Sequence, residues 1–216
     1  MLSNLKIWYF ALILCGSVLF SSDLNAAHLV GGEITYTCSG NNSYQIKLRI
    51  YRDCNGGGAS FDQSVNFTIF DDQGNVLFNP SVSKGATVQV PSATGNPCLT
   101  TPPNICTEYA EYIHIMSLPA RLGGYTISYQ RCCRNASIAN IVSSGKGNTY
   151  TIQVPSMDNC NSTPQFTTVP PIVLCKSDAL NIDASAADSN GDSLFYEFCD
   201  IPVSYTHLRA HETIPD

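Results

Sequence analysis

The sequence predicts an all-β chain, with an immunoglobulin-like antiparallel β-sandwich followed by a truncated second β module. Apolar and polar residues alternate with a period of two along several short runs, and no run has a sustained helical periodicity. Turn residues separate these runs. Nine cysteines beyond residue 27 add the disulfides that are typical of an exported β-domain.

Residues 1–27 have the features of a signal peptide. Lys6 precedes an apolar run over residues 7–20, polar residues follow it, and we expect cleavage after Ala26 or Ala27. The run is shorter than the about 20 apolar residues that span a bilayer, so we expect no membrane span in the mature chain. The protein is therefore expected to be secreted or displayed on the outer cell surface.

The first domain is expected over residues 28–159. Its clearest strand is the run 44–50, in which Tyr44 and Leu48 belong to a buried row and the residues between them face water. In the run 109–116 the same alternation sets one row against another, and we expect His114 on the polar face. The first row is Tyr109, Glu111, Ile113 and Ile115, and the second is Tyr112, His114 and Met116. Further strands are expected near residues 34–38, 65–70, 87–90, 125–129 and 150–154, with turns at residues 39–42, 55–58, 71–75, 95–97, 123–124 and 143–147.

Residues 160–171 are rich in Asn, Ser, Thr and Pro and predict a linker. A second module is expected over residues 172–201, with strands near residues 180–184 and 194–198 around a turn at residues 188–192. This module is too short to close a sandwich, so its apolar residues should lack covering strands. These residues are Leu180, Ile182, Leu194, Phe195 and Phe198.

The cysteine pattern favours disulfides over a metal site, because no C-x-x-C pair occurs. An odd number of cysteines leaves at least one without a partner in this chain. We predict a Cys98–Cys106 pair across a short Pro-rich loop and a Cys175–Cys199 pair inside the second module. The pairing of the other mature cysteines is open: Cys38, Cys54, Cys132, Cys133 and Cys160.

Cys132 and Cys133 are adjacent and lie between two arginines. Neighbouring strand residues point to opposite faces, so we expect these cysteines to reach different partners rather than form a vicinal disulfide. We expect Arg131 and Arg134 to hold backbone carbonyls or carboxylates rather than a ligand.

Composition argues against several function classes. Only 13% of residues are charged, the net charge is -6, and no basic patch is present for nucleic acid. His28 and His114 are the only histidines before residue 203, which leaves little for a histidine-based triad. Carboxylate pairs such as Glu108 with Glu111 are better explained as solvated charges than as a glycoside-hydrolysing pair. We therefore expect no catalytic residue and no enzyme activity.

Asp188, Asn190 and Asp192 offer closely spaced oxygen atoms of the kind that calcium prefers. The spacing does not fit an EF-hand, and a plain Asx turn before a strand explains the same residues. A calcium site and an Asx turn both stay open here, and no other cofactor is expected.

Three ordered motifs carry a resemblance: residues 28–36 (HLVGGEITY), 51–57 (YRDCNGG) and 129–135 (YQRCCRN). With residues 170–173 (PPIV), this set resembles the N-terminal region of large secreted proteins described as gliding-motility-associated or type IX secretion C-terminal-domain proteins. Such proteins have immunoglobulin-like, PKD-like or cadherin-like repeats. The resemblance implies export by the general secretory route and then display or release through a C-terminal sorting domain.

The tail, residues 203–216, resembles a translated sequencing adapter. We treat it as non-native, so that the natural fragment ends near residue 201, and expect it to form a loose end that does not pack on the sandwich.

Two functions follow as expectations. The first is a non-enzymatic extracellular or cell-surface structural or adhesion module of a larger secreted bacterial protein, with an extracellular protein or glycan as partner. The alternative is a carbohydrate-binding module attached to a missing catalytic domain. The mature chain lacks Trp and most of its tyrosines occupy alternating core rows, which disfavours the alternative.

Overall fold

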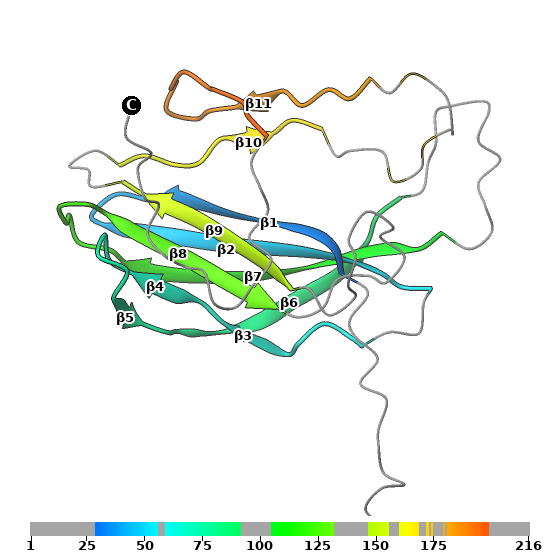
Figure 1. Cartoon of the computed structure of the whole chain (residues 1–216), viewed down its shortest axis with the longest axis horizontal. Helices are drawn as coiled ribbons and strands as arrows, with labels where there is room; N and C mark the ends of the chain where they lie inside the picture. The colour runs from blue at the N-terminus through cyan, green and yellow to red at the C-terminus, as the bar shows by residue number, and fades with distance from the viewer. Residues whose placement is uncertain are drawn as a thin grey trace, which may run out of the picture.

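The structure, a computed structural model, describes residues 29–55, 59–91, 105–131, 147–155, 160–168, 172, 174, 179 and 181–198. The described chain is all-β. Strands β1 to β9 form a five-stranded and a four-stranded antiparallel sheet that pack face to face as a β-sandwich (Figure 1). A separate strand pair, β10 with β11, lies beside the sandwich above β1 in the view of Figure 1.

The five-stranded sheet is built around a long central pair. Strands β2 (Ser43–Asp53) and β7 (Thr107–Ser117) pair along their whole length. The order is β1-β2-β7-β6-β3, with β1 (Leu29–Cys38), β6 (Ser81–Gln89) and β3 (Ser64–Asn66) on either side. The predicted turn at residues 39–42 joins β1 to β2, where Asn41 and Asn42 adopt the positive φ that asparagine tolerates.

The four-stranded sheet has the order β5-β4-β8-β9. Its strands are β4 (Thr68–Phe70), β5 (Val76–Phe78), which the sequence did not predict, β8 (Tyr125–Arg131) and β9 (Asn148–Val154).

One bent hairpin closes a side of the sandwich. Val65 of β3 lies opposite Val82 of β6, and Ile69 of β4 lies opposite Phe78 of β5, so the two strand pairs share one register. Phe67 stands at the bend, where its side chain is fully buried and its N–H donates to the Pro80 carbonyl at 3.1 Å. The chain therefore passes from one sheet to the other within a single hairpin, whose strands β3 and β5 are terminal strands of the two sheets.

The core lies between the two sheets and confirms the predicted alternation of residues 44–50. Ile46, Leu48 and Ile50 of β2 are fully buried, and Ile127 and Tyr129 of β8 belong to the same cluster. Gln45, Lys47 and Arg49 of β2 are only partly buried.

The predicted position of His114 on a polar face is wrong. His114 lies opposite Ile46, in the inward-facing row of β7 that holds the buried Tyr112 and Met116, and its side chain is half-buried. Ile113 and Ile115 are exposed instead, at 47% and 66%. Both rows of this strand contain apolar residues, so pairing with β2 decides which row faces the core.

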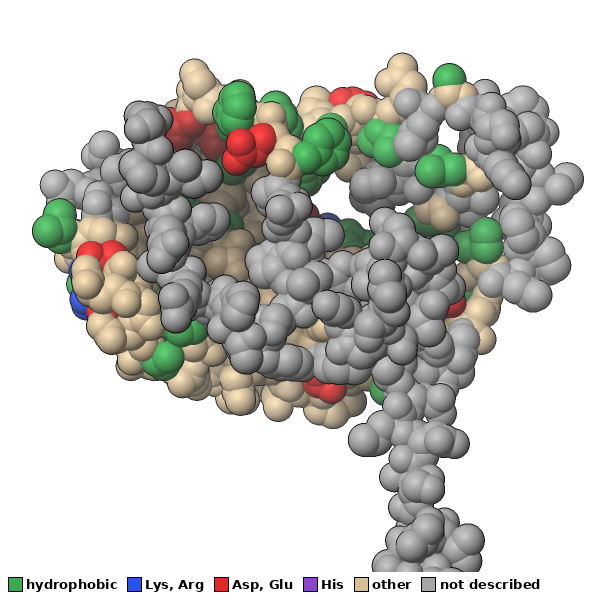
Figure 2. Space-filling model, in the orientation of Figure 1, with side chains coloured by type: hydrophobic (Ala, Val, Ile, Leu, Met, Phe, Trp, Pro, Cys, Tyr) green, Lys and Arg blue, Asp and Glu red, His purple; other side chains and the backbone are tan. Residues whose placement is uncertain are grey.

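The second strand pair consists of β10 (Gln165–Phe166) and β11 (Ala186–Ala187). Neither residues 181–184 nor residues 194–198 form a strand, contrary to the prediction. Ile182, Phe195 and Phe198 are exposed, as predicted for residues without covering strands, whereas Leu194 is half-buried. Figure 2 shows hydrophobic side chains along the upper rim, where β10, β11 and the neighbouring residues lie in Figure 1. Leu180, the signal peptide and the tail lie outside the described residues.

Candidate functional site: the disulfide-anchored junction

Two disulfides are present among the described residues, Cys38–Cys160 and Cys54–Cys106. The predicted Cys98–Cys106 pair is therefore wrong. Cys54 follows β2 and Cys106 precedes β7, and the pairing of these strands places the two Cα atoms 5.1 Å apart. The register between β2 and β7, rather than nearness along the chain, therefore determines which cysteine pairs with Cys106. The other cysteines lie outside the described residues, so the Cys175–Cys199 pair stays a prediction: Cys98, Cys132, Cys133, Cys175 and Cys199.

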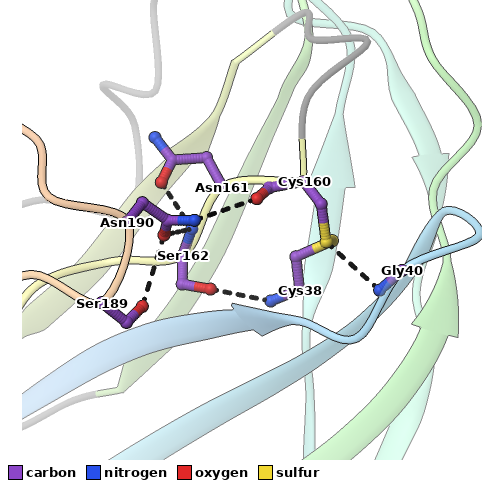
Figure 3. Close-up of a disulfide and its surroundings, with 7 residues drawn as sticks. All are labelled: Cys38, Gly40, Cys160, Asn161, Ser162, Ser189 and Asn190. Carbon is purple, nitrogen blue, oxygen red and sulfur yellow. Dashed lines mark hydrogen bonds between the residues drawn. A yellow bond between two sulfur atoms is a disulfide. The ribbon is translucent and has the colours of Figure 1, made fainter.

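The Cys38–Cys160 disulfide begins a tightly bonded junction at the end of β1 (Figure 3). Residues 160–163, which we call the edge cap, lie along the outer edge of β1. The Cys38 N–H donates to Ser162 Oγ at 3.1 Å, and the Tyr36 N–H donates to Thr163 Oγ1 at 3.0 Å. The Thr163 N–H donates to the Tyr36 carbonyl at 3.0 Å. Side-chain hydroxyls thus bond to amides that another strand would otherwise pair with.

The loop at residues 188–192 binds the edge cap from the other side (Figure 3). The Asn190 side chain donates one hydrogen bond to the edge cap and accepts another from it. Its Nδ2 donates to the Cys160 carbonyl at 3.1 Å, and its Oδ1 accepts from the Ser162 N–H at 3.0 Å. Asn161 Nδ2 donates to Asp192 Oδ2 at 2.9 Å. This loop, the edge cap and β1 therefore form one connected network.

An Asx turn shapes that loop. Asp188 Oδ1 accepts from the N–H groups of Asn190 and Asp192, at 2.8 and 3.0 Å. The hydrogen bond from Asp192 is the main cause that lowers the pKa of Asp188 below its ordinary value. Burial raises the pKa of Tyr36, and electrostatic interactions with Tyr44, Asp188 and Asp192 add to that shift. The edge strand therefore lies within the electrostatic reach of the loop.

The structure brings the three predicted calcium ligands, Asp188, Asn190 and Asp192, together in the Asx turn that was the alternative interpretation. Each side chain already makes hydrogen bonds to protein groups. Across the described ranges, no group of three or more His, Cys, Asp or Glu side chains is placed to hold a metal ion. Calcium binding by this turn stays a prediction.

The segment expected to be a linker carries residues that the sequence analysis missed. Asn161, Ser162 and Thr163 bond to β1 or to the loop at residues 188–192. Their Ser/Thr/Asn composition, which was the basis for the linker prediction, is also what supplies short hydrogen-bonding side chains. No local pattern marks β1 as their partner.

The opposite end of the sandwich contains two arginines in structural roles, Arg52 of β2 and Arg131 of β8. Arg131 pairs with Asp62 at 3.2 Å and donates to the Ser60 carbonyl at 3.3 Å, which confirms the predicted role of this arginine. Arg52 pairs with Glu108 and donates to the Ala59 carbonyl at 2.8 Å. Arg134 lies outside the described residues.

The candidate carboxylates are not assembled as a catalytic pair. Glu108 and Glu111 lie in opposite rows of β7, so they face opposite sides of the sheet. Each is held by an arginine, Glu108 by Arg52 and Glu111 by Arg49, with Arg49 Nη2 at 2.6 Å from Glu111 Oε1. A third carboxylate, that of Asp71, is also paired with an arginine, with Arg121 Nη2 at 3.1 Å from Asp71 Oδ2.

The outer face of the five-stranded sheet contains an aromatic pair. Tyr51 and Tyr109 lie opposite each other on β2 and β7, with ring centroids 5.6 Å apart, and both are half-buried. The Arg49 guanidinium lies 4.9 Å from the centre of the Tyr109 ring. In β2 the even-numbered residues face the core and the odd-numbered residues face outward. Tyr51 shares the outward row with Lys47 and Arg49, so the alternation in the sequence places it outside.

Comparisons with known protein families, with curated proteins and with solved structures gave no match. Within the part of the chain that the structure describes, no helix is long and apolar enough to cross a membrane.

Proposed function

We propose that the chain is a non-enzymatic structural or adhesion module of a larger secreted bacterial surface protein, and that it bears load as a spacer. The sequence resemblance extends this proposal to surface proteins of the gliding-motility or type IX secretion class. The two disulfides are compatible with an extracellular protein, because such compartments are oxidising.

The observation that carries the proposal is the Cys38–Cys160 disulfide. It joins the first strand of the sandwich to the segment that follows the last one, across a sequence separation of 122 residues. A pulling force applied outside these two cysteines passes along β1 to Cys38 and then through the covalent bond, so it bypasses the strands between the two cysteines, β2 to β9. This arrangement suits a spacer that must keep its fold under tension.

Single-molecule force spectroscopy tests the proposal. The mature chain is pulled from handles at residues 28 and 201. We expect the residues between Cys38 and Cys160 to stay locked, which hides about 440 Å of contour length at about 3.6 Å per residue. Release of that length without a reductant would overturn the load-bearing role.

A Cys38→Ser/Cys160→Ser chain is the matched control. The Cys54–Cys106 bridge, with a separation of 52 residues, should stay closed in it. The difference between separations of 122 and 52 is 70 residues, so up to about 250 Å should be released. If the control chain releases no more contour length than the wild type, the disulfide does not carry the force.

Carbohydrate binding is a second candidate, favoured by the outward Tyr51–Tyr109 pair. Tyrosine rings on an exposed sheet face can stack on sugar rings, and polar neighbours can bond to hydroxyls. The position of Arg49 over Tyr109 counts against it, because the cation occupies space beside one ring.

A glycan array separates the two candidates. Saturable binding by the mature chain that is lost in both Tyr51→Ala and Tyr109→Ala would favour the second function. Absence of binding across the array would favour the structural role. A Tyr125→Phe chain serves as the control, because the Tyr125 hydroxyl donates to the Pro119 carbonyl away from this pair.

A further inference from the structure

We propose that Asn190–Gly191 is a site of spontaneous deamidation, and that the aspartate or isoaspartate formed there opens the junction. The proposal rests on the proposed function only for its biological meaning, as a regulator of how firmly the module is held. The chemistry and the geometry stand on the junction itself.

Asn190 is the residue whose side chain bonds to the edge cap in both directions. Its amide nitrogen donates to the Cys160 carbonyl and its amide oxygen accepts from the Ser162 N–H. A carboxamide offers a donor and an acceptor on the same planar group, whereas an ionised carboxylate only accepts. Neither aspartate nor isoaspartate at this position can keep the donor.

The residue that follows is the one that favours deamidation. Gly191 has a φ of 81° and is exposed, and a Cβ built on it would meet nothing within 4 Å. A glycine leaves its N–H free of steric shielding by a side chain, and its flexible backbone can turn that nitrogen toward the Asn190 side chain.

The reaction conserves atoms with water as the co-reactant. The Gly191 backbone nitrogen attacks Cγ of Asn190 to form a five-membered imide ring. The Cγ–Nδ2 bond breaks, and Nδ2 leaves as ammonia with the proton from the Gly191 nitrogen. Water then adds to one of the two ring carbonyls and breaks its bond to nitrogen, which produces aspartate or isoaspartate.

The product conflicts with the closed junction. In the aspartate product, a carboxylate oxygen in place of Nδ2 would face the Cys160 carbonyl across the present 3.1 Å, so a hydrogen bond becomes a repulsive contact. It would also add a negative charge beside Asp188, which bonds to the Asn190 N–H, and near Asp192. The closed junction holds both side-chain atoms of Asn190, so the reaction requires transient opening and its product retains the open state.

The first experiment follows the reaction by peptide mass spectrometry during incubation of the mature chain in warm, mildly alkaline buffer. We expect conversion at Asn190, and roughly tenfold faster conversion in Cys38→Ser/Cys160→Ser, because the junction opens more often there. The other Asn-Gly pair, Asn55–Gly56, is the internal control and should react at one rate in both chains. No conversion at Asn190, or equal rates in the two chains, would overturn the proposal.

The second experiment measures hydrogen exchange over residues 160–168 in Asn190→Asp and in Asn55→Asp. The first substitution reproduces the aspartate product, and the second adds the same charge away from the junction. We expect roughly tenfold faster exchange in Asn190→Asp only. Unchanged exchange in Asn190→Asp would overturn the proposal. The force measurement on the wild type tests the disulfide and not Asn190, so the two proposals fail separately.

Discussion

Gly32 is the position of β1 at which the sandwich leaves no room for a side chain. A Cβ there would lie 2.7 Å from the Arg49 carbonyl oxygen and 2.9 Å from the Tyr150 ring. The Tyr150 ring stacks on Tyr129 of the core, with centroids 6.4 Å apart. The glycine therefore lets β9 approach β1 and close this side of the sandwich.

We predict that Gly32→Ala lowers the free energy of unfolding by about 1–3 kcal/mol, because the ring and the backbone must both shift. Urea unfolding followed by tyrosine fluorescence measures the change. Gly31→Ala is the matched control, since a Cβ at Gly31 meets nothing within 4 Å. The control should stay within about 0.5 kcal/mol of the wild type. Equal losses in the two variants would contradict the steric explanation.

Asp71 makes the stability of the sandwich depend on pH. Burial favours the neutral acid, but hydrogen bonds from Asn75 and Gln73 and the nearby Arg121 charge outweigh it, so the pKa of Asp71 is lowered. A carboxyl group with a lowered folded pKa stabilises the fold above its ordinary pKa of about 3.9. That stabilisation is lost as the pH falls through the folded value.

We therefore predict that Asp71→Asn makes the chain less stable at neutral pH and reduces the further loss of stability on acidification below about pH 4. Unfolding midpoints in urea across a pH series measure both effects. Asp72→Asn is the control, because Asp72 lies 3.9 Å from Arg121 and is more exposed. A parallel pH profile for the wild type and Asp71→Asn would refute this role for Asp71.

At the scale of elements, the two disulfides close loops of different length. Cys38–Cys160 has a sequence separation of 122 residues and Cys54–Cys106 a separation of 52. A cross-link restricts the unfolded chain more when the loop is longer.

We predict that replacing Cys38 and Cys160 by serine destabilises the chain more than the same change at Cys54 and Cys106. The ratio of the two separations corresponds to a difference of about 0.8 kcal/mol. Denaturant titrations of the two double variants provide the comparison. A larger loss of stability in the variant without Cys54–Cys106 would show that loop length does not determine which disulfide stabilises the chain more.

At the scale of the whole molecule, the edge cap blocks an open sheet edge. Strand β1 pairs with β2 on one side, and on the other side Ser162 and Thr163 bond to the main chain of Tyr36 and Cys38. An uncapped strand edge is a template for pairing with another chain.

A chain of residues 28–155 with Cys38→Ser lacks the cap, and we predict that it self-associates as its concentration rises. A chain of residues 28–168 keeps the cap and the disulfide and should stay monomeric. Size-exclusion chromatography with light scattering measures both masses. If the shorter chain is monomeric at every concentration, the cap is not what protects this edge.

The sequence alone determined the fold class and the position of most strands. In the run of residues 44–50 the alternation is local, and burial of Ile46, Leu48 and Ile50 follows directly from it. The turn at residues 39–42 is also encoded locally, because Gly40, Asn41 and Asn42 accept the backbone conformation that it requires. Export was an expectation from the signal-peptide pattern of residues 1–27, and disulfide formation was an expectation from export and the cysteine pattern. The two disulfides in the structure agree with the second expectation.

Tertiary structure decided what depends on partners distant in the sequence. Both rows of β7 are partly apolar, so only its register with β2 turned Tyr112 inward and Ile113 outward. The same register gave Cys106 the partner Cys54 rather than the nearer Cys98. Ser162 and Thr163 were predicted to be linker residues, because their hydrogen-bond partners on β1 lie more than 120 residues away in the sequence and no local pattern indicates them. Period and turn chemistry act between neighbours along the chain, whereas pairing, edge capping and the junction exist only once the sheets have formed.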